Sequence, residues 1–165
     1  MRPQRIEPGP GQESVWDYPR PPRCEADPRL VEVVFAGRTI ASTRSAIRVL
    51  ETSQAPAFYL PAEDVDETFL VEGKARRTYC EWKGHASYVD VVIGRLRSDT
   101  AGWRYLSPDP AFEAIRGHYA FYPSRVDECR VDGVIVGSNE GDFYGGWITP
   151  EVVGPFKGAV GTMGW

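Results

Sequence analysis

Residues 30–43 read Leu-Val-Glu-Val-Val-Phe-Ala-Gly-Arg-Thr-Ile-Ala-Ser-Thr, and this stretch decides the fold class. Its β-branched residues predict strands at residues 30–35 and 39–43, and Ala36-Gly37-Arg38 predicts the turn between them. Short runs of the same kind, separated by turn residues about every eight to twelve positions, continue to Val136. We therefore expect a single, mainly β domain of two packed antiparallel sheets over residues 30–136.

One stretch in this domain predicts a helix. Residues 111–116 follow Ser107-Pro108-Asp109-Pro110 and end before Gly117, a residue type that commonly terminates helices. A single helical turn is also expected at residues 61–65, because proline suits the first helical position and acidic residues suit the first turn. The expected fold is thus mainly β with one short helix.

Two irregular segments flank the expected β domain. Residues 1–29 contain seven of the fourteen prolines, which predicts an extended arm. Residues 137–165 contain eight of the seventeen glycines together with five large rings, Phe143, Tyr144, Trp147, Phe156 and Trp165. Because soluble proteins seldom leave so many rings exposed, we expect this C-terminal strap to dock on the domain or on a second copy of the chain, which would form a homodimer.

The composition excludes several classes of function. The chain has 165 residues, a formal net charge of -4 at pH 7 and a pI near 5.3, so its charge gives no reason to propose a nucleic-acid partner. Its apolar runs are too short to cross a bilayer, and the N-terminus lacks the apolar core of a signal peptide. We expect a cytoplasmic protein with no membrane partner.

The cysteine count argues against disulfides and against zinc. Cys24, Cys80 and Cys129 are odd in number and widely spaced, so they do not predict a disulfide framework. Structural zinc sites usually need four clustered Cys or His ligands, whereas this chain has three cysteines and two histidines in isolation. No metal site and no cofactor are expected.

Lysine is rare among the basic residues. Only Lys74, Lys83 and Lys157 are lysines among nineteen basic residues. Two of them share a local context, Trp82-Lys83-Gly84 and Phe156-Lys157-Gly158. A lysine kept where arginine is otherwise used indicates that a compact ammonium is needed there.

The stretch from Thr78 to Tyr88 has the highest density of reactive groups in the chain. Cys80 is a candidate nucleophile, since a cation such as Lys83 or His85 would lower its thiol pKa. The alternative is a small buried residue at the end of a strand. Lys83 is a candidate anion-binding residue, and its alternative is a solvated turn lysine lying over Trp82.

His85 and His118 are candidate general bases, and their alternative is a hydrogen-bonded surface position. A planar ligand could stack on aromatic β residues, although such residues more commonly form core. Asp64 and Glu51 could face the same pocket, and the alternatives are a first-turn acid and a strand-end charge. The predicted ligand-binding residues are Lys83, Tyr88, Glu51, Tyr59, Trp82 and Tyr122.

Several motifs in order resemble the domain-of-unknown-function family 427 (DUF427), some of whose members carry the name nucleotidyltransferase-like. The matching pieces are residues 13–22, 49–53, 59–61 and 63–65, Cys80 with Lys83-Gly84 and Ala86-Ser87-Tyr88, and residues 120–122 and 145–150. The resemblance implies a Mss4-like, or β-tent, pair of sheets. Structural cousins of this family bind zinc through paired cysteines, which this chain lacks.

The chain departs from the family pattern at two positions. Gln54 stands where the family often has histidine, and Glu81 stands where it often has proline after the cysteine. Glutamine cannot exchange a proton near neutral pH, so the first departure argues against a histidine-based mechanism there.

Two functions follow from these patterns. The first is a module that binds a small polar or anionic molecule in a pocket around residues 80–88, because the cluster lacks a complete acid-base or nucleophile constellation. The second is an enzyme, a transferase acting on a nucleotide-like or phosphorylated substrate, with Lys83 binding the anion and Cys80 or His85 doing the chemistry. Magnesium would enter only under this second alternative.

Overall fold

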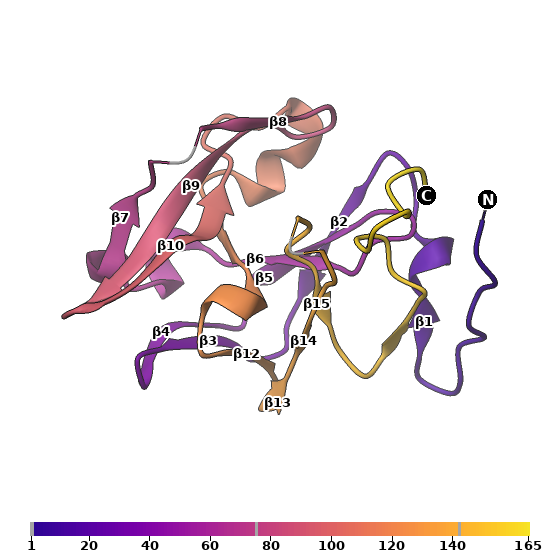
Figure 1. The fold of residues 1–165 in the computed structure, drawn as a ribbon, viewed down its shortest axis with the longest axis horizontal. Coiled ribbons are helices and arrows are strands. Elements are labelled where there is room, and N and C mark those ends of the chain that lie inside the picture. The colour runs from indigo at the N-terminus through magenta and orange to yellow at the C-terminus, as the bar shows by residue number, and fades with distance from the viewer. Residues whose placement is uncertain (1, 75, 142) are drawn as a thin grey trace.

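The computed structural model describes residues 2–74, 76–141 and 143–165. The fold is mainly β, as expected, and its strands are joined by 3₁₀ turns (Figure 1). The strands are β1 (Glu13–Ser14), β2 (Arg23–Asp27), β3 (Val31–Phe35), β4 (Arg38–Thr43), β5 (Ala46–Leu50), β6 (Ala57–Tyr59), β7 (Leu70–Glu72), β8 (Thr78–Cys80), β9 (Gly84–Ile93), β10 (Leu96–Arg104), β11 (Tyr119–Phe121), β12 (Glu128–Val131), β13 (Val134–Ile135), β14 (Gly137–Ser138), β15 (Trp147–Ile148) and β16 (Val152–Val153). The 3₁₀ turns are η1 (Val15–Asp17), η2 (Ala62–Asp64), η3 (Glu67–Phe69), η4 (Pro110–Ile115) and η5 (Pro123–Arg125).

Two sheets form the body of the domain. The larger has the order β11-β10-β9-β7, with β8 also pairing to β9, and the second has the order β13-β12-β3-β4. A three-stranded sheet, β2-β5-β6, continues the fold, and β14 pairs with β15. These pairs are antiparallel, whereas β1 pairs with β16 in parallel.

The main hydrophobic core contains residues from both large sheets. Val33 comes from β3 and Val91 from β9, and neither side chain is exposed. Phe58 of β6 and Phe121 of β11 extend the same cluster. The core residues of β3 (Val31, Val33 and Phe35) and of β9 (Val89 and Val91) are two positions apart, which places them on one face of each strand.

The predicted turn at residues 36–38 is confirmed by its backbone geometry, and a second turn of the same kind joins β12 to β13. Ala36 and Gly37 between β3 and β4 have φ of 52° and 73°, and Asp132 and Gly133 between β12 and β13 have φ of 48° and 80°. Two successive residues with positive φ are the geometry of a tight hairpin turn, which Gly and Asp tolerate well.

One expectation about local structure is wrong and another is refined. Residues 1–29 are not irregular throughout, because Arg23–Asp27 forms β2 and pairs along its whole length with β5. The partner strand lies far along the chain, so local sequence carries no signal for it. The expected short helix is present as the 3₁₀ helix η4, which has non-helical dihedrals at Phe112. A segment of six residues between Asp109 and Arg116 is too short to propagate an α-helix.

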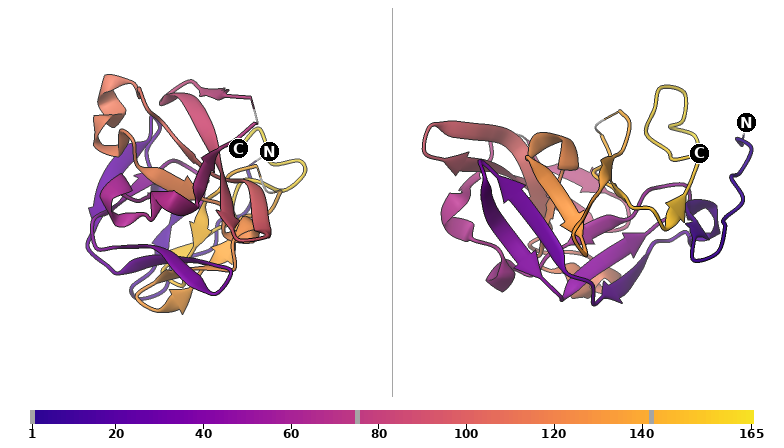
Figure 2. Two further views of the ribbon diagram at one scale, coloured as in Figure 1. Left: turned by 90° about the vertical axis from the view of Figure 1, so that its left-hand side faces the viewer. Right: turned by 90° about the horizontal axis from the view of Figure 1, so that it is seen from below.

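The two ends of the chain lie side by side (Figure 2). Glu13 of β1 pairs with Val152 of β16, and the indole N–H of Trp16 donates to the carbonyl of Pro155 at 2.9 Å. The ring centroids of Trp16 and Trp165 are 5.7 Å apart. The N-terminal arm and the C-terminal strap therefore hold each other.

A buried arginine links the N-terminal arm to β2 and β5. Arg48 of β5 donates to Glu13 and to Glu25, each at 2.8 Å, and its Nε lies 3.6 Å from Asp27. Asp27 also accepts hydrogen bonds from Arg29. Because breaking a buried ion pair leaves an unpaired buried charge, this network makes the attachment of the arm sensitive to Arg48.

The C-terminal strap packs against the core of the same chain. Trp147 of β15 is completely buried, its ring stacks on Phe58 with centroids 4.8 Å apart, and its N–H donates to the carbonyl of Phe121 at 3.0 Å. Phe143 of the same strap is 64% exposed. Among the described residues, no helix combines the length and the apolar character needed to cross a membrane.

Candidate functional site

A cavity of about 560 Å³ lies beside β6, β9 and β10, and its walls are largely aromatic. We call it the aromatic cavity. Among the described residues, its lining includes nine rings, from Tyr59, Tyr79, Trp82, Tyr88, Trp103, Tyr105, Tyr122, Phe143 and Tyr144. Its charged lining residues are Arg76, Lys83, Arg125, Lys157, Glu51 and Glu81. The volume lies in the range of small-molecule sites.

The turn between β8 and β9 fixes the backbone of Lys83 at this cavity. Gly84 follows with φ of 101°, a conformation that glycine adopts without strain. The carbonyl of Lys83 accepts a hydrogen bond from the amide of Asp109 at 3.2 Å. The position of Lys83 is thereby tied to the segment that leads into η4.

The ammonium of Lys83 faces rings instead of a carboxylate. Its Nζ lies 5.9 Å from the ring centroid of Tyr105 and 5.8 Å from that of Phe112, which is within cation–π range. No carboxylate of the described residues lies within 4.0 Å of it. Such an ammonium can accept an anionic partner without first breaking an ion pair.

Buried phenols line the inner wall. Tyr59 is 1% exposed, and the indole N–H of Trp103 donates to its hydroxyl at 3.1 Å. Tyr105 is 6% exposed, and its hydroxyl forms no hydrogen bond with any other described residue. Burial raises the pKa of both phenols well above its ordinary value, so both remain neutral hydrogen-bond donors.

Glycines allow the C-terminal strap to approach the cavity closely. A Cβ on Gly145 would lie 2.2 Å from the Trp103 ring, and a Cβ on Gly146 would lie 2.4 Å from the carbonyl oxygen of Ala55. Phe143 and Tyr144, which precede them, line the cavity with ring centroids 4.9 Å apart. The small residues therefore let the strap form one wall of the cavity.

The structure brings most of the predicted site residues to this cavity. Cys80 and all six predicted ligand-binding residues line it: Lys83, Tyr88, Glu51, Tyr59, Trp82 and Tyr122. Of these, Glu51 already has a partner, since its carboxylate lies 3.6 Å from Nε of Arg20.

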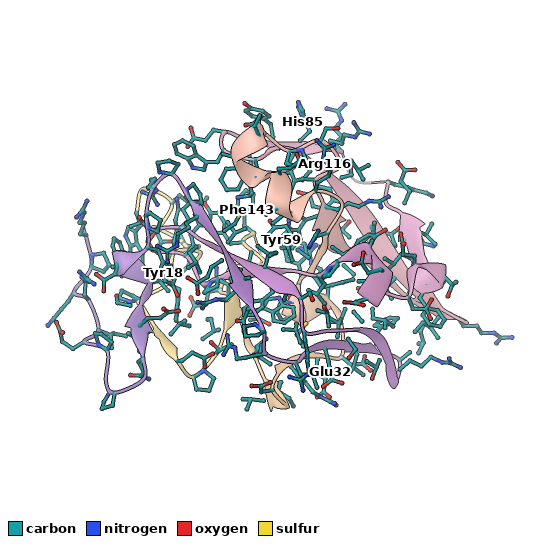
Figure 3. All side chains as sticks on the ribbon, turned by 180° about the vertical axis from the view of Figure 1, so that it is seen from behind. Tyr18, Glu32, Tyr59, His85, Arg116 and Phe143 are labelled. Carbon is teal, nitrogen blue, oxygen red and sulfur yellow. The ribbon has the colours of Figure 1, made fainter. Side chains whose placement is uncertain are left out.

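The predicted histidines and Asp64 lie elsewhere. His85 is exposed, its ring is tilted by 54° against that of Tyr79 with centroids 5.1 Å apart, and it lies at the edge of the molecule away from Tyr59 (Figure 3). His118 contacts the carbonyl of Arg116 at 3.2 Å. Asp64 accepts a hydrogen bond from Thr43 at 2.7 Å, which fits a structural role. Neither histidine is among the described residues that line the cavity.

The three cysteines have different surroundings. Cys80 is half-buried and lines the aromatic cavity. Burial raises the pKa of Cys24, although the charge of Lys83 acts in the opposite direction. Cys129 lies in the main core, where burial raises its pKa strongly. The described residues bring no group of three His, Cys, Asp or Glu side chains together that could hold a metal ion.

The sequence prediction missed the contribution of Lys157, Tyr144, Trp103 and Tyr105. Lys157 lines the cavity, and its Nζ lies 5.4 Å from the ring centroid of Tyr144. The repeated aromatic-Lys-Gly sequence around Lys83 and Lys157 was the one signal that could have found it.

A family model described as "Domain of unknown function (DUF427)" matches residues 23–132, which is more than half of the chain. The chain belongs to the DUF427 family. No match was found among curated proteins. In this DUF427 chain the matched region begins with β2 and ends after β12, so the strap residues that line the cavity lie outside it. The β-tent arrangement implied by the resemblance stays a prediction.

Proposed function

We propose that this DUF427 chain binds a small anionic molecule that contains a planar ring, in the aromatic cavity. The observation that carries the proposal is the ammonium of Lys83, a lining residue, which lies against the rings of Tyr105 and Phe112 without a carboxylate among the described residues to neutralise it. An anionic group would supply the missing charge in a partly desolvated position, where charge-assisted hydrogen bonds are strong.

The charge of the lining supports an anion. Among the residues that the structure describes, four cationic side chains line the cavity, against the two acids Glu51 and Glu81. The ion pair between Glu51 and Arg20 offsets part of that negative charge. The lining therefore favours a negatively charged molecule over a neutral or cationic one.

The rings of the lining support a planar molecule. Tyr59 meets Trp103 edge to face at 6.1 Å, and Trp103 meets Tyr122 at 4.7 Å, so these rings form a continuous aromatic wall. The hydroxyl of Tyr105, which has no hydrogen-bond partner in the described part of the chain, adds a donor for an acceptor group on the ligand. Binding is favoured over catalysis because neither histidine accompanies Cys80 among the described lining residues.

The test compares an acid with its neutral amide. Isothermal titration and thermal shift would use 2-naphthoate and 2-naphthamide, with benzoate and biphenyl-4-carboxylate to vary the ring size. We expect the acids to bind and to raise Tm by mass action, and the amide to bind at least tenfold more weakly. A further titration with 5′-AMP, with and without magnesium, tests the transferase alternative. An increase in Tm that requires both 5′-AMP and magnesium would favour that alternative.

Lys83→Met should weaken 2-naphthoate binding about tenfold or more, because the variant retains the stem and removes the charge. Lys74→Met is the matched control, since Lys74 is exposed and is not among the residues lining the cavity. Equal affinity for the acid and the amide, or equal losses in the two variants, would contradict the proposal.

A further inference from the structure

Lys157 is a second ammonium at the aromatic cavity. Its Nζ lies over the ring of Tyr144, 5.4 Å from the centroid, and no carboxylate of the described residues lies within 4.0 Å of it. The cavity therefore has two lysines that contact rings and lack an ion-pair partner among the described residues, Lys83 and Lys157.

The two lysines are presented in the same way. Each follows an aromatic residue and precedes a glycine with positive φ, 101° at Gly84 and 150° at Gly158. A Cβ on Gly158 would lie 2.4 Å from the carbonyl oxygen of Glu140, so this position requires glycine. In both places a glycine directly after the lysine sets the course of the backbone.

The backbone of each lysine is anchored by a distant segment. Lys157 donates its amide to the carbonyl of Ser53 at 2.8 Å and accepts from the side-chain amide of Asn139 at 2.8 Å. The carbonyl of Lys83 is held by the amide of Asp109. Anchoring of this kind reduces the entropy lost when a ligand is bound.

The lysines reach the cavity from different parts of the fold. Lys83 follows β8 in the family-matched region, whereas Lys157 belongs to the C-terminal strap outside it. Figure 1 shows β8 and the yellow C-terminal segment in separate parts of the molecule. The two ammonium groups contact different rings, Tyr105 and Phe112 at Lys83 and Tyr144 at Lys157. This arrangement suits two acidic groups on one ligand better than a single acidic group.

We infer that the ligand is an aromatic diacid, with one acidic group bound by Lys83, the other bound by Lys157, and the planar ring held between the aromatic walls. This inference rests on the proposed function and names its ligand class. It also assigns the binding of the second acidic group to the C-terminal strap. Selectivity for a diacid therefore depends on a segment that the family match does not include.

The experiment pairs each diacid with the monoacid of the same ring. Terephthalate, naphthalene-2,6-dicarboxylate and biphenyl-4,4′-dicarboxylate would be titrated beside benzoate, 2-naphthoate and biphenyl-4-carboxylate. We expect at least one diacid to bind tenfold or more tightly than its monoacid. This exceeds the statistical factor of about two that two equivalent ends provide.

Lysine variants locate the two ends. Lys157→Met should bring the affinity for the preferred diacid down to that of its monoacid and leave monoacid binding at Lys83 within about twofold. Lys157→Arg should retain the preference for the diacid, because it restores the charge. Circular dichroism and Tm of the unliganded variants show whether each one is folded.

The outcomes separate the two proposals. If monoacids bind through Lys83 but no diacid is preferred, or if Lys157→Met leaves that preference intact, the diacid inference is wrong and the proposed function stands. If no acid of either series binds, both are wrong. Both proposals are supported if the preference for a diacid is lost in Lys157→Met and kept in Lys157→Arg and in Lys74→Met.

Discussion

Replacing Trp147 by alanine tests whether the C-terminal strap is part of the core. The side chain is completely buried, stacks on Phe58 and donates its N–H to the carbonyl of Phe121. A buried tryptophan removes about 200 Å² from water, worth about 5 kcal/mol at about 25 cal/mol per Å². The methyl group of alanine and relaxation of the neighbours recover part of this, so we expect Trp147→Ala to lower the free energy of unfolding by about 3–5 kcal/mol.

A second variant separates the ring from its hydrogen bond. Trp147→Phe keeps most of the ring and leaves the buried carbonyl of Phe121 without its donor, which should cost about 1–3 kcal/mol. Phe143→Ala is the control from the same strap, because its ring is 64% exposed, and we expect a change within about 0.5 kcal/mol.

The assay is urea unfolding followed by far-ultraviolet circular dichroism, since tryptophan fluorescence would change with the substitution itself. Stability is taken from the midpoint, with the slope m compared to verify that the unfolding transition is unchanged. A loss below about 1 kcal/mol for Trp147→Ala, equal to that of Phe143→Ala, would refute the packing of the strap in the core.

Two further predictions concern thiols and acid. Iodoacetamide at pH 7.5, with labelling monitored by mass spectrometry, should label Cys80 first and Cys24 more slowly, because burial raises the pKa of Cys24. Cys129 should react only after unfolding. Rapid labelling of Cys129 in the native protein would contradict its burial. The hydrogen bond from Arg48 lowers the pKa of Glu25, against the opposing effect of burial. The stability that this pair contributes is therefore fully present above the pKa of Glu25 in the unfolded chain, about 4.3. It is lost as the pH falls through the lower pKa of the folded protein. Between pH 6 and pH 3, Tm should therefore fall more steeply in the native protein than in the variant Arg48→Met, which starts from a lower Tm. Parallel plots of Tm against pH would show that the pair of Arg48 and Glu25 does not set the acid sensitivity.

The β class and several turns were predictable because they depend on local chemistry. Gly37 and Gly133 occupy positive-φ turn positions that the sequence indicates directly. The strand β2 was not predictable, since it exists through pairing with β5, and its sequence between Pro22 and Pro28 resembles an irregular arm. The 3₁₀ form of η4 depends on a balance within a very short segment that residue preferences do not resolve.

The same distinction applies to the cavity. Cys80, Trp82, Lys83 and Tyr88 were found because they are neighbours in sequence. The wall formed by residues 143–146 and 157 depends on where the strap packs, which rests on the long-range burial of Trp147. His85 was grouped with these residues by proximity in sequence, yet its side chain is exposed on β9 and is not among the described lining residues.

The parallel pair of β1 and β16 determines how the molecule would respond to a mechanical pull on its two ends. Force applied before Glu13 and after Val153 loads the two strands in shear, so both register pairs, Glu13 with Val152 and Ser14 with Val153, bear it together. A ladder of two pairs is short and would rupture before the longer ladders of β9 and β10. Its rupture would transmit tension into the part of the strap that precedes β16, which includes residues 143–146 of the cavity wall. Stretching would therefore disassemble one wall of the cavity while the two large sheets remained intact.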